Sequence, residues 1–239
     1  RNMAIERIKA SWRLGERRRL IPENCWQSQW RKPPQRVLAF IQARQTSTRL
    51  PNKIYADLNG APVLYHTIAR AKESMVDDAV VLSPVPLPEL PEGVLAFSCD
   101  IDEDNVLGRY AKAAEAYPCD FIVRLTSDCP LLDPYLIDFV IAKAIEHDAD
   151  YCSNVYDSSF PDGADVEVIK TSTLLWLNEK VIGEGWREHV TLAIRDNREL
   201  SEKLRVVSIV NDINLSGIKL SVDTTEDLER VREAEARYA

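Results

Sequence analysis

From residue 36 onward, short apolar runs alternate with segments in which apolar residues recur at helical spacing. The apolar runs predict strands, and the spaced segments predict helices. The expected strands cover residues 37–43, 79–83, 94–98, 121–125, 164–169, 204–210 and 218–222. The expected helices cover residues 63–75, 106–117, 134–147, 172–180, 187–197 and the chain from residue 225 onward. This alternation predicts an α/β fold with a mostly parallel sheet flanked by helices, in which ligands bind beyond the carboxyl ends of the strands.

Residues 1–35 have a different character. They are rich in Arg, and they hold Trp12, Trp26 and Trp30, three of the five tryptophans of the chain. Ile5, Ile8 and Trp12 recur at helical spacing, which predicts a short amphipathic helix over residues 4–14. The prolines in "RKPPQR" then predict a linker. We therefore divide the chain into a basic N-terminal extension or linker, residues 1–35, and a domain of residues 36–239.

Composition narrows the class of protein. The chain of 239 residues has a formal net charge of −8, and the basic extension makes the remainder more acidic still. An acidic domain argues against general nucleic-acid binding. The 5 cysteines include no CxxC pair, which favours reduced, buried thiols in the cytoplasm. Because no apolar run reaches the length needed to cross a bilayer, we expect a cytoplasmic protein without stable membrane insertion.

The stretch "QARQTSTRLPNK", residues 42–53, directly follows the first predicted strand of the domain. It contains Arg44, Arg49 and Lys53, three hydroxyl side chains and no acid. The chain has neither a Walker loop nor a glycine-rich dinucleotide motif, so a phosphate here must be held by side chains. Arginine and lysine are suited to that task. The alternative is a solvated basic turn.

Two aspartates follow predicted strands. Asp128 follows the strand at 121–125, and Asp223 follows the strand at 218–222. Mg²⁺ binds one or two carboxylates together with phosphate oxygens, so the pair predicts a metal site beside the cationic loop. Turn formation or helix capping is the alternative for each aspartate taken alone.

Six motifs follow one another from about residue 36 to the end of the chain, namely "IQARQTSTRLPNK", "VLGRYAKAAE", "VRLTSDCPLLDP", "FPDGADVEV", "REHVT" and "LSVDTTEDLE". In this order they resemble the motifs of SpsF-like cytidylyltransferases, the spore coat polysaccharide biosynthesis type. These are relatives of the enzymes that make CMP-3-deoxy-octulosonate and CMP-sialic acids. The resemblance implies a Rossmann-like nucleotidyltransferase fold and Mg²⁺-dependent transfer of CMP from CTP to a sugar or sugar-like acceptor. Pyrophosphate would be released, and the product would serve cell-surface or secondary polysaccharide biosynthesis.

The resemblance also implies roles for individual residues. The catalytic residues would be Arg44, Arg49, Lys53 and Asp128. The nucleotide would be bound by Gln42, Ala43, Arg44, Ser47, Arg49, Lys53, Arg109, Arg124, Thr126 and Asp128. Asp165, Glu167, Glu188 and His189 would line the acceptor side. Asp128 and Asp223 would hold the metal.

Two other classes of protein stay open. Relatives commonly have glycine where this chain has Thr46, Asn52 and Ser127, and these departures favour an altered substrate, weakened activity or a non-catalytic nucleotide-binding or scaffolding module. A glycosyltransferase of similar nucleotide-binding fold is the second alternative. Its DxD metal motif has the spacing of "DED" at 102–104, but that segment precedes a predicted helix. The acceptor itself stays open between an acidic sugar, an amino sugar and a phosphonate.

The N-terminal extension needs a separate explanation. Trp and Arg are enriched at protein interfaces, so we expect the extension to contact a second copy in a homodimer or a neighbouring domain of a longer chain. Folding back onto the acidic surface of its own domain, a lipid surface and a simple tail are the alternatives. Because the motifs begin at the first strand of the domain, we expect catalysis not to require this segment.

Overall fold

The computed structural model describes residues 5–13 and 35–238. Its central element is an eight-stranded sheet in the order β1-β10-β8-β9-β7-β2-β5-β6. Its strands are β1 (Glu6–Ala10), β2 (Val37–Gln42), β5 (Asp78–Ser83), β6 (Leu95–Ser98), β7 (Phe121–Thr126), β8 (Tyr151–Ser153), β9 (Glu167–Lys170) and β10 (Val206–Asn211). Neighbouring strands are parallel except that β9 runs antiparallel to both β7 and β8. The mostly parallel sheet predicted from the sequence is confirmed.

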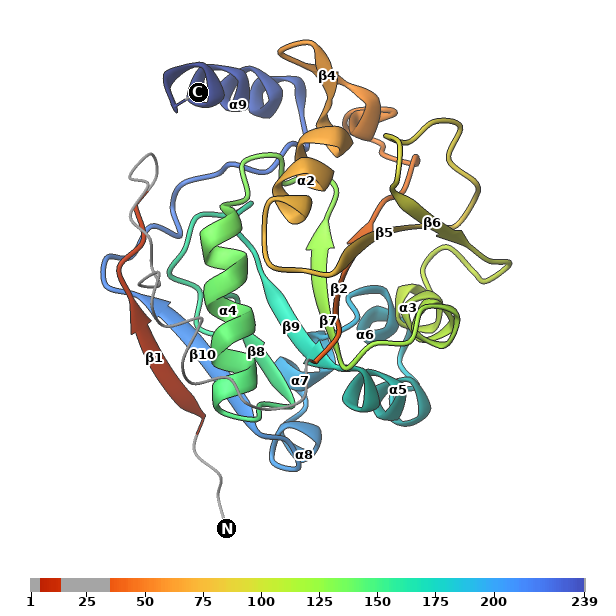
Figure 1. The fold of residues 1–239 in the computed structure, drawn as a ribbon, viewed down its shortest axis with the longest axis vertical. Coiled ribbons are helices and arrows are strands. Elements are labelled where there is room, and N and C mark those ends of the chain that lie inside the picture. Colours follow the sequence, from red (N-terminus) through yellow and green to blue (C-terminus); the bar gives the residue numbers. More distant parts are fainter. Residues whose placement is uncertain (1–4, 14–34, 239) are drawn as a thin grey trace.

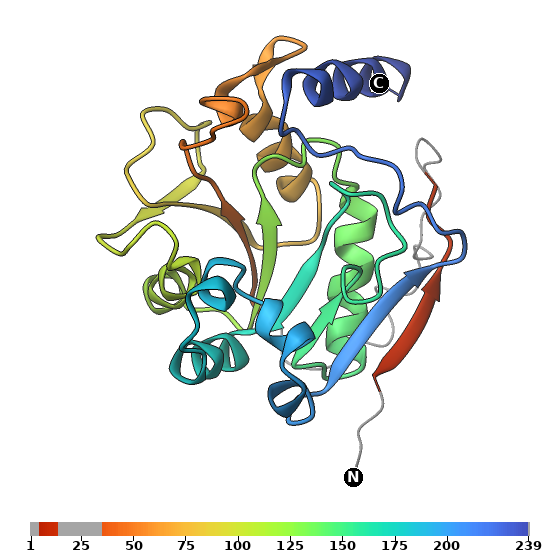
Figure 2. The same ribbon diagram turned by 180° about the vertical axis from the view of Figure 1, so that it is seen from behind.

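Helices cover both faces of the sheet (Figures 1 and 2). One face carries α2 (Val63–Lys72) and α4 (Pro134–Glu146). The opposite face carries α3 (Val106–Ala116), α5 (Thr171–Lys180), α6 (Glu184–Glu188), α7 (Leu192–Asp196) and α8 (Arg198–Ser201). The C-terminal α9 (Thr225–Tyr238) lies near the hairpin of β3 (Asp57–Leu58) and β4 (Ala61–Pro62). A short 3-10 helix, η1 (Lys53–Tyr55), precedes that hairpin.

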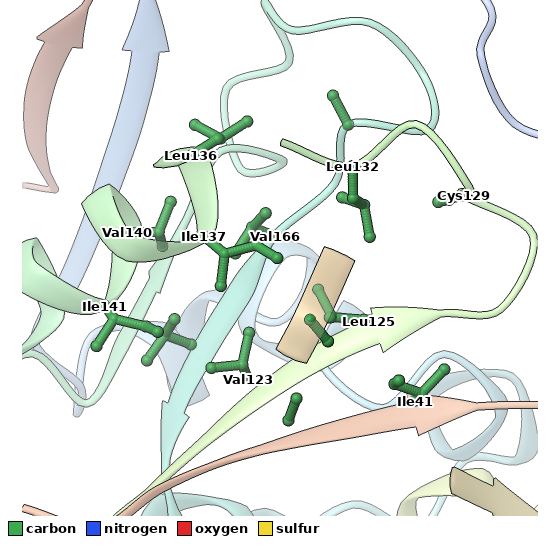
Figure 3. Close-up of a cluster of buried hydrophobic side chains, with 14 of the residues drawn as sticks. Ile41, Val123, Leu125, Cys129, Leu132, Leu136, Ile137, Val140, Ile141 and Val166 are labelled. Atoms are coloured by element: carbon green, nitrogen blue, oxygen red, sulfur yellow. The ribbon is translucent and has the colours of Figure 1, made fainter. Parts of the chain in front are cut away.

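Strand β2 shows why the central strands are apolar throughout. Successive side chains of a strand point to opposite faces, and both faces of this sheet are covered. Val37, Ala39 and Ile41 therefore enter the core beneath α2 and α4, whereas Leu38 and Phe40 enter the core beneath α3 and α5. Figure 3 shows the first of these cores, in which Ile137, Val140 and Ile141 of α4 pack toward the side chains of β7.

The helix predicted over residues 4–14 is wrong, because the described part of this segment forms β1, which pairs in parallel with β10. Ile8, Ala10 and Trp12 turn toward the protein, and the residues between them are exposed. Trp12 is only 4% exposed. This part of the N-terminal segment therefore belongs to the sheet. Trp26, Trp30 and the predicted linker from residue 31 to residue 34 lie outside the described residues.

Two further expectations differ from the structure. The strand predicted at 218–222 is reduced to an isolated bridge between Asp162 and Lys219. The helix predicted at 187–197 is divided into α6 and α7, because Val190 between them has a φ of 53°. A β-branched residue with positive φ is strained, so the surrounding packing must hold this break in place. Strand β8 and helix α8 were not predicted.

Candidate active site

The two predicted site loops leave the sheet side by side. Strands β2 and β7 are parallel neighbours, and Gln42 is in register with Thr126 at their carboxyl ends. The backbone N–H of Ser127 donates to the carbonyl of Gln42 over 3.0 Å, which ties the start of one loop to the start of the other. The cationic loop after β2 and the Asp128 loop after β7 therefore share one edge of the sheet, where ligands of parallel α/β sheets bind.

Local turn chemistry shapes the cationic loop. Ser47 Oγ accepts the backbone N–H of Leu50 at 3.3 Å, and Asn52 takes a left-handed conformation with φ 54°. Asn tolerates this conformation better than most residues, so the departure from glycine at this position is compatible with the turn. Thr46 has no left-handed backbone, and its hydroxyl donates to Glu103. The substitution of glycine by Thr46 therefore causes no backbone strain.

The loop brings Lys53 between the two aspartates. Lys53 Nζ lies 2.5 Å from Asp128 Oδ2 and 2.9 Å from Asp223 Oδ1. Arg49 adds a second cation, 3.0 Å from the same oxygen of Asp223. A backbone hydrogen bond from the N–H of Val222 to the carbonyl of Asp128, 2.8 Å long, links the segments of the two aspartates. The structure thus places both predicted metal ligands and two predicted phosphate ligands in one cluster.

Lys219 also joins this cluster, and no motif of the sequence pointed to it. Its Nζ lies 3.0 Å from Asp223 Oδ2 and 2.8 Å from Asp227 Oδ2. Both oxygens of Asp223 therefore contact cations. Burial alone would raise the pKa of Asp223, but hydrogen bonds from Lys53 and Lys219 outweigh it and lower that pKa. Asp223 is consequently held as an anion.

Charge also fixes the state of Lys53. Desolvation would lower the pKa of Lys53, but the charge of Asp128 and hydrogen bonds to Asp128 and Asp223 raise it. The ammonium is therefore retained at the point where the two carboxylates converge. The cluster thus holds a cation between two anions at the edge of the sheet.

The residues present fit a magnesium ion of the kind that completes its coordination with substrate oxygens. In the described part of the chain, no three His, Cys, Asp or Glu side chains gather as a metal site of their own. Mg²⁺ needs no such cage, since one or two carboxylates and phosphate oxygens are a common ligand set. Asp128 and Asp223 supply two carboxylates at one place. The donor set is thus suited to a metal that arrives with a nucleotide.

A buried polar network lies at the neighbouring strands. Glu167 of β9 accepts from Arg124 of β7, from Tyr151 over 2.6 Å and from Thr191. Arg124 also donates to Gln42 Oε1 at 3.2 Å. Burial would raise the pKa of Glu167, but the charge of Arg124 and these hydroxyl donors lower it. The carboxylate of Glu167 is therefore fully engaged in holding Arg124, and its predicted contact with an acceptor stays a prediction.

The other predicted acceptor residues are placed differently. Glu188 at the end of α6 lies 3.7 Å from Arg44, which joins the acceptor side to the cationic loop. His189 follows it and is exposed. Asp165 is half-buried, and burial together with the charges of Glu167 and Asp162 raises its pKa to about 7. The side chains predicted for the acceptor thus form no single contact group.

Arg109 is buried, with 2% exposure, and points to the chain just before its own helix. Its guanidinium donates to the carbonyls of Asp102 and Glu103 at 3.2 and 3.1 Å. Asn105 caps the same helix, and Arg187 donates to its side chain at 2.9 Å. These contacts fix the segment that carries Glu103, and Glu103 accepts a hydrogen bond from Thr46 of the cationic loop. A direct nucleotide contact by Arg109 stays a prediction.

The remaining predicted nucleotide ligands lie in the loops themselves. Ala43 is buried and its N–H donates to Leu82, and the Thr126 hydroxyl lies 3.0 Å from Cys129 Sγ. A separate pocket of about 780 Å³ opens at the amino ends of β1 and β10, lined in part by Glu6, Arg195 and Arg205. It lies at the other end of the strands, so we assign the chemistry to the charged cluster rather than to this pocket.

A charged cluster at the carboxyl edge of a mostly parallel α/β sheet is typical of nucleotide-binding proteins of Rossmann-like fold. Comparison with known proteins makes this specific, because the sequence profile of the cytidylyltransferase family matches residues 38–236. The chain belongs to the cytidylyltransferase family, whose members are nucleotidyltransferases. In the part of the chain that the structure describes, no helix is long and apolar enough to cross a membrane.

Individual relatives agree with the family. The spore coat polysaccharide biosynthesis protein SpsF of Bacillus subtilis is 28% identical over 82% of this chain and 85% of its own length. The 3-deoxy-manno-octulosonate cytidylyltransferase of Serratia proteamaculans is 26% identical over 82% of this chain and 98% of its own. A cytidylyltransferase structure from Leptospira borgpetersenii superposes with a TM-score of 0.77 at 28% identity, covering 86% of this chain and 89% of that one.

Proposed function

We propose that this protein transfers CMP from CTP to a sugar or sugar-like acceptor and releases pyrophosphate, with Mg²⁺ as cofactor, in polysaccharide biosynthesis. The observation that carries the proposal is the convergence of Lys53 and Arg49 on Asp128 and Asp223 at the carboxyl edge of β2 and β7. Family membership and the similarity to a polysaccharide biosynthesis protein support the choice of CTP and of the pathway.

The chain's own residues account for binding and charge stabilisation. Transfer of a nucleotidyl group places negative charge on the oxygens of the α-phosphate and on the leaving pyrophosphate. Arg44, Arg49 and Lys53 would bind these oxygens, and each is held near its place by a carboxylate in the described structure. Bound Mg²⁺ would neutralise phosphate charge and orient the triphosphate, held by Asp128 and Asp223.

The network around Arg124 would keep the floor of the site rigid. Its guanidinium joins Gln42 of β2 to Glu167 of β9, and Glu167 in turn accepts from Thr191 in the chain after α6. Fixed donors of this kind cost no reorganisation when charge develops, which is the basis of electrostatic catalysis. Arg124 would thus contribute by holding its neighbours in the site in place as much as by contacting the nucleotide.

The test is a screen for pyrophosphate release. CTP, UTP, ATP and GTP are each incubated with Mg²⁺ and a panel of acidic sugars, amino sugars and phosphonates. We expect release with CTP and one class of acceptor, and much slower release with the Asp128→Asn variant. A glycosyltransferase would instead release nucleotide from a nucleotide sugar, and a non-catalytic module would release neither. Calorimetry that finds UTP or ATP bound far more tightly than CTP would contradict the choice of nucleotide.

A further inference from the structure

Trp12 lies outside the segment that the family profile matches, yet it reaches the loops of the site. It lies two residues after the end of β1 at Ala10, and its backbone is fixed to Asn211 of β10 by two hydrogen bonds. The N–H of Trp12 donates to Asn211 Oδ1 at 2.9 Å, and Asn211 Nδ2 donates back to its carbonyl at 3.1 Å. This reciprocal pair fixes the point from which the indole projects.

The indole contacts the loop that carries Asp128. Trp12 Nε1 donates to Asp133 Oδ2 at 2.8 Å, and the other oxygen of Asp133 accepts the backbone N–H of Tyr135 at 2.9 Å. Asp133 is the N-cap of α4, so the residue that ends the Asp128 loop is held from two sides. The N-cap bond holds the carboxylate at the helix start, and the additional bond from the indole to this charged acceptor fixes the side chain further.

The same indole contacts the loop that holds the Asp223 segment. Its ring lies 6.0 Å from the ring of Phe160, centroid to centroid. Two residues later, Asp162 exchanges backbone hydrogen bonds with Ile218 and Leu220, at 3.0 and 2.6 Å. Trp12 therefore stands between the loop of Asp128 and the loop that fixes the chain leading to Asp223.

We propose that Trp12 is a positioning residue that sets the separation of Asp128 and Asp223 by bracing their two loops against β1. This proposal rests on the proposed function, because it assigns the geometry a role in binding the metal with CTP. It reverses the expectation that the N-terminal segment is dispensable for catalysis. The indole N–H is the decisive group, since packing on Phe160 alone leaves the Asp128 loop without this restraint.

The test measures metal binding without turnover. Mn²⁺ is titrated into the full-length protein with saturating CTP and no acceptor, and free Mn²⁺ is followed by electron paramagnetic resonance. Trp12→Phe keeps an aromatic ring beside Phe160 but removes the N–H donor. We expect it to weaken Mn²⁺ binding about fivefold to tenfold while CTP affinity without metal changes less than twofold. Trp176→Phe, in the partly buried Trp of α5, is the matched control and should bind Mn²⁺ as the wild type does.

A second variant excludes a general packing defect. Asp133→Asn retains a good N-cap when its oxygen faces Tyr135, but the amide NH2 then stands in place of Oδ2 and cannot accept from the indole N–H. It should reproduce the loss seen in Trp12→Phe, and the double variant should lose no more than either single variant. Wild-type Mn²⁺ affinity in both single variants, or additive losses in the double variant, would overturn the proposal.

The Mn²⁺ titration and the pyrophosphate assay together distinguish a failure of the role of Trp12 from a failure of the proposed function. If the wild type releases pyrophosphate and the variants bind Mn²⁺ normally, only the role of Trp12 fails. If the wild-type complex with CTP binds no Mn²⁺, the metal site and the role of Trp12 fail together.

Discussion

Asp128 and Asp223 can be tested one charge at a time. We expect Asp128→Asn and Asp223→Asn each to lower kcat by on the order of 100-fold, because each removes an anionic metal ligand and leaves Lys53 with one carboxylate. Initial rates of pyrophosphate release at saturating Mg²⁺ measure the effect. Asp212→Asn, at an exposed position, is the control. Near-normal rates in both site variants would remove the metal assignment.

Arg49 should affect binding more than stability. Its side chain is 63% exposed, and its contact with Asp223 is a surface ion pair of small energetic value. Arg49→Ala should therefore melt like the wild type while CTP affinity falls about tenfold, and Arg49→Lys should restore part of it because the fork geometry is lost. Scanning calorimetry measures melting and titration calorimetry measures CTP affinity, with Arg198→Ala as an exposed control. Unchanged CTP affinity in Arg49→Ala would exclude the contact.

Asp165 makes the stability of the protein depend on pH. Burial and the charges of Glu167, Asp162 and Asp128 raise its pKa in the folded state to about 7, and Arg124 opposes them. Its pKa in the unfolded chain is about 3.9, so the folded state binds the extra proton between these values. The contribution of Asp165 to the free energy of unfolding is present at pH 4 and is lost as pH rises through 7.

Asp165→Asn mimics the protonated carboxyl and should remove this dependence. At pH 8 the variant should be more stable by up to about 4 kcal/mol, since one pKa unit corresponds to about 1.4 kcal/mol. At pH 4 the two proteins should melt together. Thermal melting in EDTA measures the difference, with Asp212→Asn as control. A constant difference across this pH range would contradict the prediction.

The sequence predicted the aspartates but not their surroundings. Asp128 and Asp223 each follow an apolar run, and such positions meet at one edge of a parallel sheet. Lys219 escaped notice because "KLSVD" suggested a strand, in which Lys219 would have been a sheet residue. The segment is instead held by backbone bonds to Asp162 and Asp128, and no periodic pattern encodes these contacts.

At the scale of elements, β1 shows how one pattern fits two structures. Ile8 and Trp12 are four residues apart, which suits one face of a helix and also one face of a strand. Ala10 lies between them and is buried, which is the strand pattern, but a small residue gives little signal in the sequence. The parallel pairing with β10 decides in favour of the strand, and it depends on residues about 200 positions away.

Gly163 tests the backbone hydrogen bonds that join Asp162 to Ile218 and Leu220, which we call the clasp. It has φ 99°, and a Cβ there would lie 2.5 Å from the backbone nitrogen of Ser221. Gly163→Ala should therefore push residues 220–221 away, lower the melting temperature by several degrees and weaken Mn²⁺ binding with CTP. Gly217→Ala, where a Cβ meets no atom within 4 Å, is the matched control. Equal melting of the two variants would show that the clasp tolerates a side chain.

At the scale of the whole molecule, the charges of the chain are unevenly distributed, and part of the basic segment lies on the acidic domain. Arg7 pairs with Asp157 at 2.8 Å, and Glu6 lies 3.0 Å from His147. The sequence left several partners open for this segment, namely the acidic surface of its own domain, another protein surface, a lipid surface and no partner. For residues 5–13 the structure gives the partner as the protein's own sheet.

Deletion of residues 1–35 should therefore destabilise the domain itself. It removes β1, exposes the edge of β10 and uncovers the site of Trp12, whose burial alone is worth about 1.5–3 kcal/mol. A loss of this size lowers the melting temperature of a domain of this length by roughly 4–10 °C. Deletion of residues 1–4 keeps β1 and should melt like the full chain. Light scattering on the same samples tests the homodimer that we also propose for this segment, since a dimer that depends on it would become monomeric. An unchanged melting temperature after the longer deletion would show that the sheet does not need its N-terminal strand.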